Sequence, residues 1–270
     1  MCNRGQVGPA SRTAEDYGKF ALEAAKLMKW TDPNVKLIAA GSSNFGAGPD
    51  WTGWNRTVPE HLKNHADYLS VHSYVGNTQN DYEDFVASSL ELGSRIKPPR
   101  GSSMPPCRAC ATAHVVKIAN MAQLVNVIAP IFTNEKGLFL QTIYYPLQLF
   151  ANHTKGKALE LFVDSAKYKS RRFDEVPYLD ASASLDNGSL VLNAVNRHRD
   201  QVLEAEIEIQ DKQFSGPVEV TEVNGPDLKA ENNFDSAPVR PVERSVAAQG
   251  KTLRFRFPPH SYVMLKAKVV

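Results

Sequence analysis

The fold class is decided by Val35-Lys-Leu-Ile-Ala-Ala-Gly-Ser-Ser-Asn44, an apolar run that ends in a polar loop. Such a run is typical of a strand in a parallel sheet, because helices cover both faces of such a sheet. The same design returns at Tyr68-Leu-Ser-Val71, which leads into His72-Ser-Tyr74. We therefore expect strands over 35–40 and 68–71, with functional side chains in the loops that follow them.

Helical patterns surround these two strands. Apolar side chains recur at helical spacing between Thr13 and Met28, and Thr13 fits the N-cap position, with Asp16 three residues further on. Shorter helices are expected over 58–64 and 81–96. The alternation of helix and strand predicts a parallel α/β fold for the first part of the chain.

From about Leu159 the pattern changes to short alternating runs, separated by turn sequences such as Asp186-Asn-Gly188. A helix is expected just before the change, over 145–155. We expect an α/β domain over 1–157 and an all-β domain of sandwich type over 158–270. The alternation predicts strands over 189–195, 203–209, 218–223, 252–257 and 261–267.

The α/β pattern is interrupted between Lys97 and Ala113, where proline, serine and cysteine replace any apolar periodicity. Cys107 and Cys110 have the C-x-x-C spacing, but prolines precede them where a redox pair would need a strand. The simpler interpretation is a flexible loop. The alternative is a foreign sequence in the place of a strand and its loop, after which an apolar segment over 115–127 predicts another strand.

Composition argues against several classes of function. There are 31 lysines and arginines and 29 aspartates and glutamates, so a net charge of +2 gives no reason to expect nucleic acid or an anionic membrane as partner. No apolar run is long enough to span a bilayer, and the first residues lack the apolar core of a signal peptide, which leaves the location open. No metal-ligand spacing and no phosphate loop occurs, so no metal or other cofactor is expected.

Six segments, in order, resemble the α-L-arabinofuranosidases of glycoside hydrolase family 51. The resemblance covers nearly the whole chain apart from roughly 97–113. The segments are Thr13-Ala-Glu-Asp-Tyr-Gly18, Lys29-Trp-Thr-Asp-Pro33, Leu37-Ile-Ala-Ala-Gly-Ser-Ser-Asn44, Asp67-Tyr-Leu-Ser-Val-His-Ser-Tyr-Val-Gly-Asn77, Ala122-Gln-Leu-Val-Asn-Val-Ile-Ala-Pro-Ile131 and Gln141-Thr-Ile-Tyr-Tyr-Pro146.

The resemblance implies a fold of class α/β plus all-β: a (β/α)8 barrel, incomplete here, followed by a C-terminal β-sandwich. Strands five, six and eight would be 35–40, 68–71 and 115–122, with strand seven replaced by 97–113. The implied activity is retaining hydrolysis of terminal L-arabinofuranosyl units of arabinan and arabinoxylan. The implied partners are an arabinose-containing polysaccharide or oligosaccharide and further copies of the chain, since family members form homo-oligomers.

Neither catalytic carboxylate can be placed in the chain. Retention requires two carboxyl groups about 5–5.5 Å apart. The family's acid/base belongs to a Gly-Asn-Glu-Met motif whose methionine matches Met1, so that glutamate is expected just before residue 1. The nucleophile is expected within 97–113, where no Asp or Glu occurs. We expect a truncated, inactive form; a genuine pseudoenzyme is the alternative.

Four residues are candidates for substrate binding. By resemblance, His72 and Tyr74 position the nucleophile and the sugar, Gln141 hydrogen-bonds a sugar hydroxyl, and Asn126 lies near the site. Each also has a simpler interpretation: a buried histidine, a core aromatic, a surface glutamine and a turn-forming asparagine. Four glutamates on predicted helices, Glu15, Glu23, Glu83 and Glu91, are expected to be solvated charges.

A second class of function stays open beside the hydrolase. The β-rich second half and the missing carboxylates also fit a non-catalytic carbohydrate-binding or structural β-sandwich protein.

Overall fold

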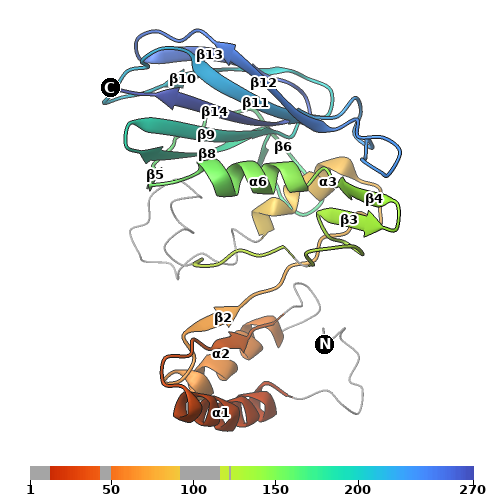
Figure 1. Cartoon of the computed structure of the whole chain (residues 1–270), viewed down its shortest axis with the longest axis vertical. Helices are drawn as coiled ribbons and strands as arrows, with labels where there is room; N and C mark the ends of the chain where they lie inside the picture. The colour runs from red at the N-terminus through yellow and green to blue at the C-terminus, as the bar shows by residue number, and fades with distance from the viewer. Residues whose placement is uncertain (1–12, 43–49, 92–115, 122) are drawn as a thin grey trace. The chain divides into compact units, whose positions relative to one another are not determined.

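The computed structural model describes residues 13–42, 50–91, 116–121 and 123–270 (Figure 1). The chain forms two compact units, Met1–Gln79 and Asn80–Val270. The boundary predicted at residue 157 stays a prediction.

Helix α1 (Ala14–Thr31) begins where its sequence predicts. Thr13 caps it, because Oγ1 accepts a hydrogen bond of 3.1 Å from the backbone N–H of Asp16 and donates one of 2.7 Å to the Asp16 carboxylate. The helix continues three residues beyond the predicted end at Met28. It ends at Asp32, which is extended because a residue before proline is driven out of the helical region.

The first unit contains a parallel pair of strands, β1 (Ile38–Ala40) and β2 (Tyr68–Ser70), as predicted. The ladder begins later than the expected residue 35, because the Leu37 N–H donates instead to the Asp67 carboxylate at 2.9 Å. Among the residues that the structure describes, no third strand joins this sheet. The incomplete (β/α)8 barrel that the resemblance implies therefore stays a prediction.

Helix α2 (Asp50–Leu62) packs with α1 and is longer than the predicted 58–64. The two helices approach each other closely at Gly18, where a Cβ atom would lie 2.5 Å from the ring of His61. The buried core of this unit consists of Ala25, Ala39, Val58 and Leu62.

In the second unit, helix α3 (Tyr82–Ala87) begins where predicted, with Asp81 as its N-cap. The part of the predicted helix over 92–96 lies outside the described residues. The strand predicted over 115–122 is wrong for residues 116–121, which are irregular. A strand requires a neighbour that exchanges backbone hydrogen bonds with it, and none of the described residues pairs with this stretch.

A hairpin follows that the sequence pattern did not predict, formed by β3 (Ile131–Asn134) and β4 (Gly137–Leu140). Phe132 and Phe139 face each other across the two strands, with ring centroids 5.1 Å apart. The hairpin leads into helix α6 (Tyr144–His153), which confirms the helix predicted over 145–155.

The C-terminal β-sandwich is present. Its larger sheet is antiparallel and has the strand order β12-β11-β14-β9-β8-β5 (Figure 1). The five strands predicted from the alternating pattern are confirmed to within one or two residues as β9, β10, β11, β13 and β14. The strands of the larger sheet are β5 (Lys157–Leu159), β8 (Leu179–Asp186), β9 (Ser189–Asn196), β11 (Val218–Asn224), β12 (Arg240–Val246) and β14 (Tyr262–Lys268).

The smaller sheet pairs β10 (Leu203–Glu208) with β13 (Thr252–Phe257). Its outer face carries charged cross-strand pairs such as Glu206 with Arg254, and its inner face is apolar. The inner face packs on the larger sheet in a core that includes Leu192, Val220, Phe255, Phe257 and Leu265. The alternation in the sequence therefore predicts correctly which side chains are buried.

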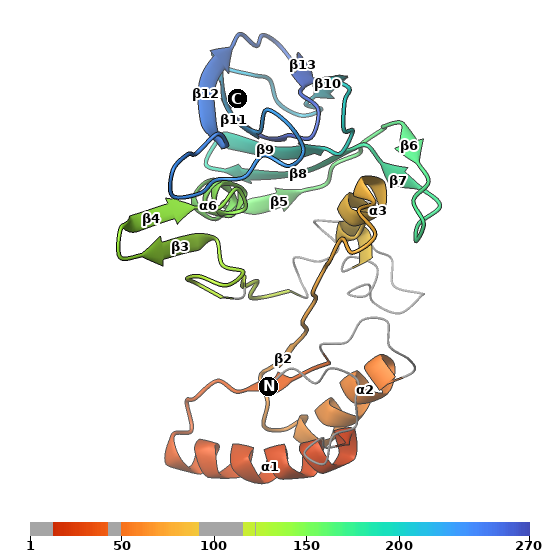
Figure 2. The ribbon, with the colours of Figure 1, turned by 90° about the vertical axis from the view of Figure 1, so that its right-hand side faces the viewer.

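Helix α6 covers the opposite face of the larger sheet (Figure 2). Leu149 of α6 packs in one cluster with Val191, Val223 and Met264. Leu192 and Leu265, which follow Val191 and Met264 in the sequence, belong instead to the core between the two sheets. A short side hairpin of β6 (Lys167–Tyr168) and β7 (Val176–Pro177) completes the unit. No helix among the described residues is long and apolar enough to cross a membrane.

Candidate functional site

The first group of predicted site residues lies in the segments that follow β1 and β2. Gly41 follows β1, and a Cβ atom there would lie 1.9 Å from the carbonyl oxygen of Ser70, so only glycine fits this approach. The next N–H, of Ser42, donates a bond of 2.9 Å to Oδ1 of Asn55. The backbone of Ser42 is thus fixed at the end of β1.

His72 and Tyr74 lie in the irregular segment that follows β2. Both are exposed, and 57% of Tyr74 is accessible to solvent. The interpretation of His72 as buried and of Tyr74 as a core aromatic is therefore wrong for the described structure. Their positions after a parallel strand agree with the loops in which such folds carry functional side chains, and their role toward a sugar stays a prediction.

Asn126 has a left-handed backbone conformation, with φ of 61°, in the loop before β3. Its Oδ1 accepts a hydrogen bond of 2.8 Å from the Thr133 N–H, and its own N–H donates to the Ile131 carbonyl at 2.8 Å. These contacts support the turn-forming interpretation of Asn126, because its amide oxygen is committed to the hairpin.

Gln141 is half-buried at the point where β4 ends and the turn to α6 begins. Its N–H donates a bond of 2.8 Å to the carbonyl of Pro130, and its carbonyl accepts one of 2.9 Å from Tyr144. The Leu140 carbonyl that precedes it accepts a bond of 2.9 Å from Nδ2 of Asn232. The backbone around Gln141 is thus fixed on both sides.

The structure brings Asn126 and Gln141 onto the same small element. Val125 bridges to Ile131 of β3, and Ile131 pairs with Leu140 at the end of β4. His72 and Tyr74 belong to the other unit. Asn232 belongs to no motif, and no local signal in the sequence points to it, because the Leu140 carbonyl that it contacts is 92 positions away.

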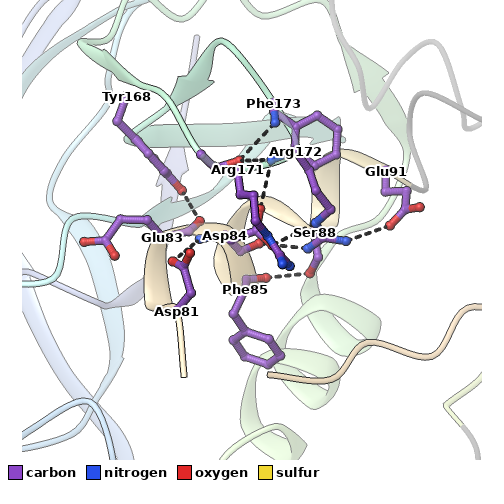
Figure 3. A network of polar contacts seen from close by, with 11 residues as sticks. Asp81, Glu83, Asp84, Phe85, Ser88, Glu91, Tyr168, Arg171, Arg172 and Phe173 are labelled. Atoms are coloured by element: carbon purple, nitrogen blue, oxygen red, sulfur yellow. Dashed lines mark hydrogen bonds and ion pairs between the residues drawn. The ribbon is translucent and has the colours of Figure 1, made fainter. Parts of the chain in front are cut away.

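A network of polar contacts in the second unit surrounds Asp84 of α3 (Figure 3). Desolvation alone would raise the pKa of Asp84, but the charge and hydrogen bonds of Arg172, with those of Arg171, outweigh it and hold that pKa below its usual range. Both carboxylate oxygens of Asp84 accept hydrogen bonds from Arg171 or Arg172, and only 4% of the residue is exposed, so the carboxylate is not accessible to a sugar. We therefore assign the network to structure.

The four glutamates on the helices are paired with basic side chains. Glu15 and Glu23 are exposed, as expected of solvated charges, whereas Glu83 and Glu91 are only partly exposed. Glu15 contacts His61 and Lys19 at 2.9 and 3.0 Å, and Glu23 contacts Lys26 at 2.7 Å. Glu83 and Glu91 pair with Arg199 and Arg172. Among the described residues, no group of His, Cys, Asp and Glu could hold a metal ion. The expected nucleophile segment, 97–113, with Cys107 and Cys110, lies outside them.

The family described as "Alpha-L-arabinofuranosidase C-terminal domain" matches residues 110–261, more than half of the chain. The chain belongs to the α-L-arabinofuranosidases. The match includes the β3–β4 hairpin, helix α6 and most of the sandwich. The resemblance to family 51 inferred from the six segments is confirmed.

Two curated relatives illustrate this membership. The intracellular exo-α-(1→5)-L-arabinofuranosidase 1 of Bacillus subtilis is 30% identical, over 97% of this chain and 64% of its own length. The probable α-L-arabinofuranosidase C of Aspergillus flavus is 33% identical, over 95% of this chain and 62% of its own length. The chain thus spans less than two thirds of these arabinofuranosidases.

Two solved arabinofuranosidases share the fold. A family 51 enzyme from Bifidobacterium longum superposes with a TM-score of 0.82 at 22% identity, covering 96% of this chain and 65% of that one. The Thermotoga maritima enzyme, solved as an arabinose complex, gives 0.80 at 24% identity, covering 99% and 65%.

Proposed function

We propose that this arabinofuranosidase chain recognises a terminal α-L-arabinofuranosyl unit of arabinan or arabinoxylan and does not hydrolyse it on its own. Gln141 is the side chain that we assign to the sugar, with Tyr74, His72 and Asn126 as further candidates. The observation that carries the proposal is the fixed backbone of Gln141 within the region that matches the family. A side chain on a fixed backbone loses little entropy when it binds.

The lack of hydrolysis follows from the acidic residues. No Asp or Glu occurs between Lys97 and His114, where the resemblance places the nucleophile. Asp84 is 4% exposed and both of its carboxylate oxygens bond to arginines, and the glutamates on the helices pair with basic side chains. We expect that an aryl α-L-arabinofuranoside is hydrolysed no faster in the presence of the purified chain than in buffer alone. Turnover that scales with protein concentration would contradict this part of the proposal.

Recognition of the sugar is tested by titrating the purified chain with L-arabinose and measuring the binding by saturation-transfer NMR. The Gln141→Ala variant loses one hydrogen bond to the sugar, and we expect affinity to fall about tenfold. Gln148→Ala, which removes an exposed glutamine of α6, is the matched control and keeps the wild-type affinity. Equal affinities of the Gln141 variant and the wild type would remove Gln141 from the site.

The second candidate function is carbohydrate binding by the β-sandwich without any remnant of a catalytic site. It is favoured by the complete two-sheet core of that domain. Saturable binding of arabinan that Gln141→Ala leaves unchanged would support it over the first proposal.

Self-association is also part of the proposal. Helix α1 exposes large apolar side chains, among them Leu27 at 60% and Trp30 at 84%. Apolar surface of this kind on a folded unit favours association between copies. Sedimentation velocity at increasing concentration tests it, and a single monomeric species throughout would contradict it.

A further inference from the structure

The peptide group between Leu140 and Gln141 is held at both ends by different parts of the second unit. Its carbonyl accepts a hydrogen bond of 2.9 Å from Nδ2 of Asn232, and its N–H donates one of 2.8 Å to the carbonyl of Pro130. A peptide group is planar, so two hydrogen bonds at its opposite ends fix its orientation. The direction in which the Gln141 side chain leaves the backbone is therefore set partly from the sandwich.

Asn232 is well suited to this task, because it is only 2% exposed and both ends of its side-chain amide are hydrogen-bonded. Nδ2 donates a second hydrogen bond, of 2.7 Å, to the Val239 carbonyl, and Oδ1 accepts one of 3.0 Å from the Val239 N–H. Both donors and an acceptor of the side chain are thus engaged, which defines one orientation for it. Water cannot easily replace a donor that is buried in this way.

The loop that carries Asn232 is itself braced against the hairpin. Phe234 contacts Phe139 of β4 edge to face, with ring centroids 4.7 Å apart. The Oδ1 atom of Asn233 accepts hydrogen bonds from the N–H groups of Asp235 and Ser236, at 2.8 and 2.9 Å. Val239 packs in the same cluster as Leu149 of α6. The loop therefore contacts both the strand before Gln141 and the helix after it.

We propose that Asn232 is a positioning residue for sugar recognition, which acts through the backbone of Gln141. The β-sandwich then does more than accompany the site, since one of its loops orients the side chain that contacts the sugar. This inference rests on the proposed function, because the contact between Gln141 and the sugar is itself proposed.

A buried asparagine could also stabilise the fold without any effect on Gln141, and the experiment separates the two roles. L-arabinose binding is measured on the full chain for the wild type, Asn232→Ala, Gln141→Ala and the double variant. The control is Asn193→Ala, which removes an equally buried asparagine that bonds to Thr154 and Tyr262 instead. Thr154 follows the last residue of α6, whereas Gln141 precedes its start.

We expect Asn232→Ala to weaken arabinose binding about tenfold, as Gln141→Ala does, and Asn193→Ala to leave it within about twofold. The double variant is expected to bind no more weakly than Gln141→Ala, because Asn232 has no effect once its target is removed. Wild-type affinity in Asn232→Ala, or losses that add in the double variant, would overturn the inference.

Hydrogen exchange of the Gln141 N–H tests the positioning without sugar. Asn232→Ala should speed this exchange at least about tenfold more than Asn193→Ala does, since the peptide group is then held at one end only. If the wild type does not bind arabinose, the proposed function is wrong but the positioning role of Asn232 is not affected. If Gln141 N–H exchange is the same in Asn232→Ala as in the wild type, the positioning role is wrong. If Asn232→Ala does not fold, Phe234→Ala replaces it, because Phe234 is 43% exposed and contacts the same hairpin. We expect this variant to weaken arabinose binding and to speed exchange of the Gln141 N–H, each about threefold.

Discussion

The carboxylate of Asp84 lies 2.9 Å from Nε of Arg172, a residue 88 positions further along the chain (Figure 3). The backbone N–H of Arg172 donates to the other carboxylate oxygen at 3.1 Å, and its guanidinium also donates to the Asp84 backbone carbonyl at 2.9 Å. Tyr168 donates to the carbonyl of Glu83 at 3.0 Å. Helix α3 is thus attached to the β6–β7 hairpin through one buried acidic residue and its neighbours.

Asp84→Ala should lower the free energy of unfolding of the second unit by about 3 kcal/mol, because it leaves Arg172 without its buried partner. Asp84 is 4% exposed, so solvent cannot replace the carboxylate. Urea denaturation followed by far-UV circular dichroism measures the change. Asp174→Ala is the control: it removes an exposed ion pair with Lys169 in the same hairpin and should leave the midpoint unchanged. Equal midpoints for the two variants would show that the network contributes little.

The network around Asp84 shows what local sequence pattern cannot supply. Alternation predicted β10 and β13 because side chains on one face of each strand are exposed and those on the other are buried or partly buried. Asn187 and Gly188, at φ of 48° and 78°, form the expected tight turn. The contact between Asp84 and Arg172 depends on how distant segments pack, which no local periodicity encodes. The β3–β4 hairpin was missed because Phe132 and Phe139 face each other on one side of a short ribbon, without a longer alternating pattern.

Asp67 makes the first unit sensitive to acid. The Lys36 ammonium, the Leu37 N–H and Lys29 all contact its carboxylate, and they hold the pKa of Asp67 well below its usual range. A depressed pKa stabilises the folded state above the unfolded pKa of about 4, and this contribution is lost as the pH falls below that value. Asp67→Asn should therefore reduce stability near neutral pH and flatten its dependence on pH below about 4.

Tryptophan fluorescence follows this change selectively, because Trp30, Trp51 and Trp54 all belong to the first unit. Urea midpoints are compared at about pH 6 and about pH 3. Glu23→Gln, which removes a helix-surface pair with Lys26, should keep the wild-type dependence. If the urea midpoint of Asp67→Asn falls between the two pH values as much as that of the wild type, Asp67 is not the source of the acid sensitivity.

Asn196 joins the end of β9 to the end of β13. Its Nδ2 atom lies within 3.0 Å of the carbonyls of Gln201, Phe257 and Pro258, and its Oδ1 accepts 2.8 Å from the His198 N–H. Asn196→Ala should lower the free energy of unfolding by about 3 kcal/mol, because it leaves several polar backbone groups without partners.

The same urea denaturation provides the measurement for Asn196. Asn187→Gly is the matched control, because glycine adopts the left-handed conformation of Asn187 readily and its stability should stay near that of the wild type. A loss below about 1 kcal/mol in Asn196→Ala would mean that water satisfies these groups in the variant.

The candidate site residues differ in how far the sequence could predict them. Gln141, His72 and Tyr74 were recognisable because each stands in a short motif that resembles the family. Asn126 was found by the same route, but its amide oxygen serves the hairpin, which a motif does not show. Asn232 carries no motif, and its importance follows only from the Leu140 carbonyl that it meets. Residues that orient others through the backbone are therefore the class that sequence alone misses here.

Tyr168 makes the second unit sensitive to alkali. Burial raises the pKa of Tyr168 to about 12, and its neutral hydroxyl donates to the Glu83 carbonyl. A raised pKa stabilises the folded state fully below the unfolded pKa of about 10, and the contribution is lost as the pH rises toward the folded value. Stability of the second unit should decline between about pH 10 and about pH 12 for this reason.

Tyr168→Phe separates this contribution from general alkaline denaturation. The variant loses the hydrogen bond to Glu83, so its free energy of unfolding at about pH 8 should fall by about 1 kcal/mol. Its further decline toward about pH 11 should be shallower than that of the wild type, since one titrating phenol is gone. Tyr144→Phe, at the start of α6, is the control and should keep the wild-type slope. If Tyr168→Phe and the wild type decline in parallel, another group is responsible for the sensitivity to alkali.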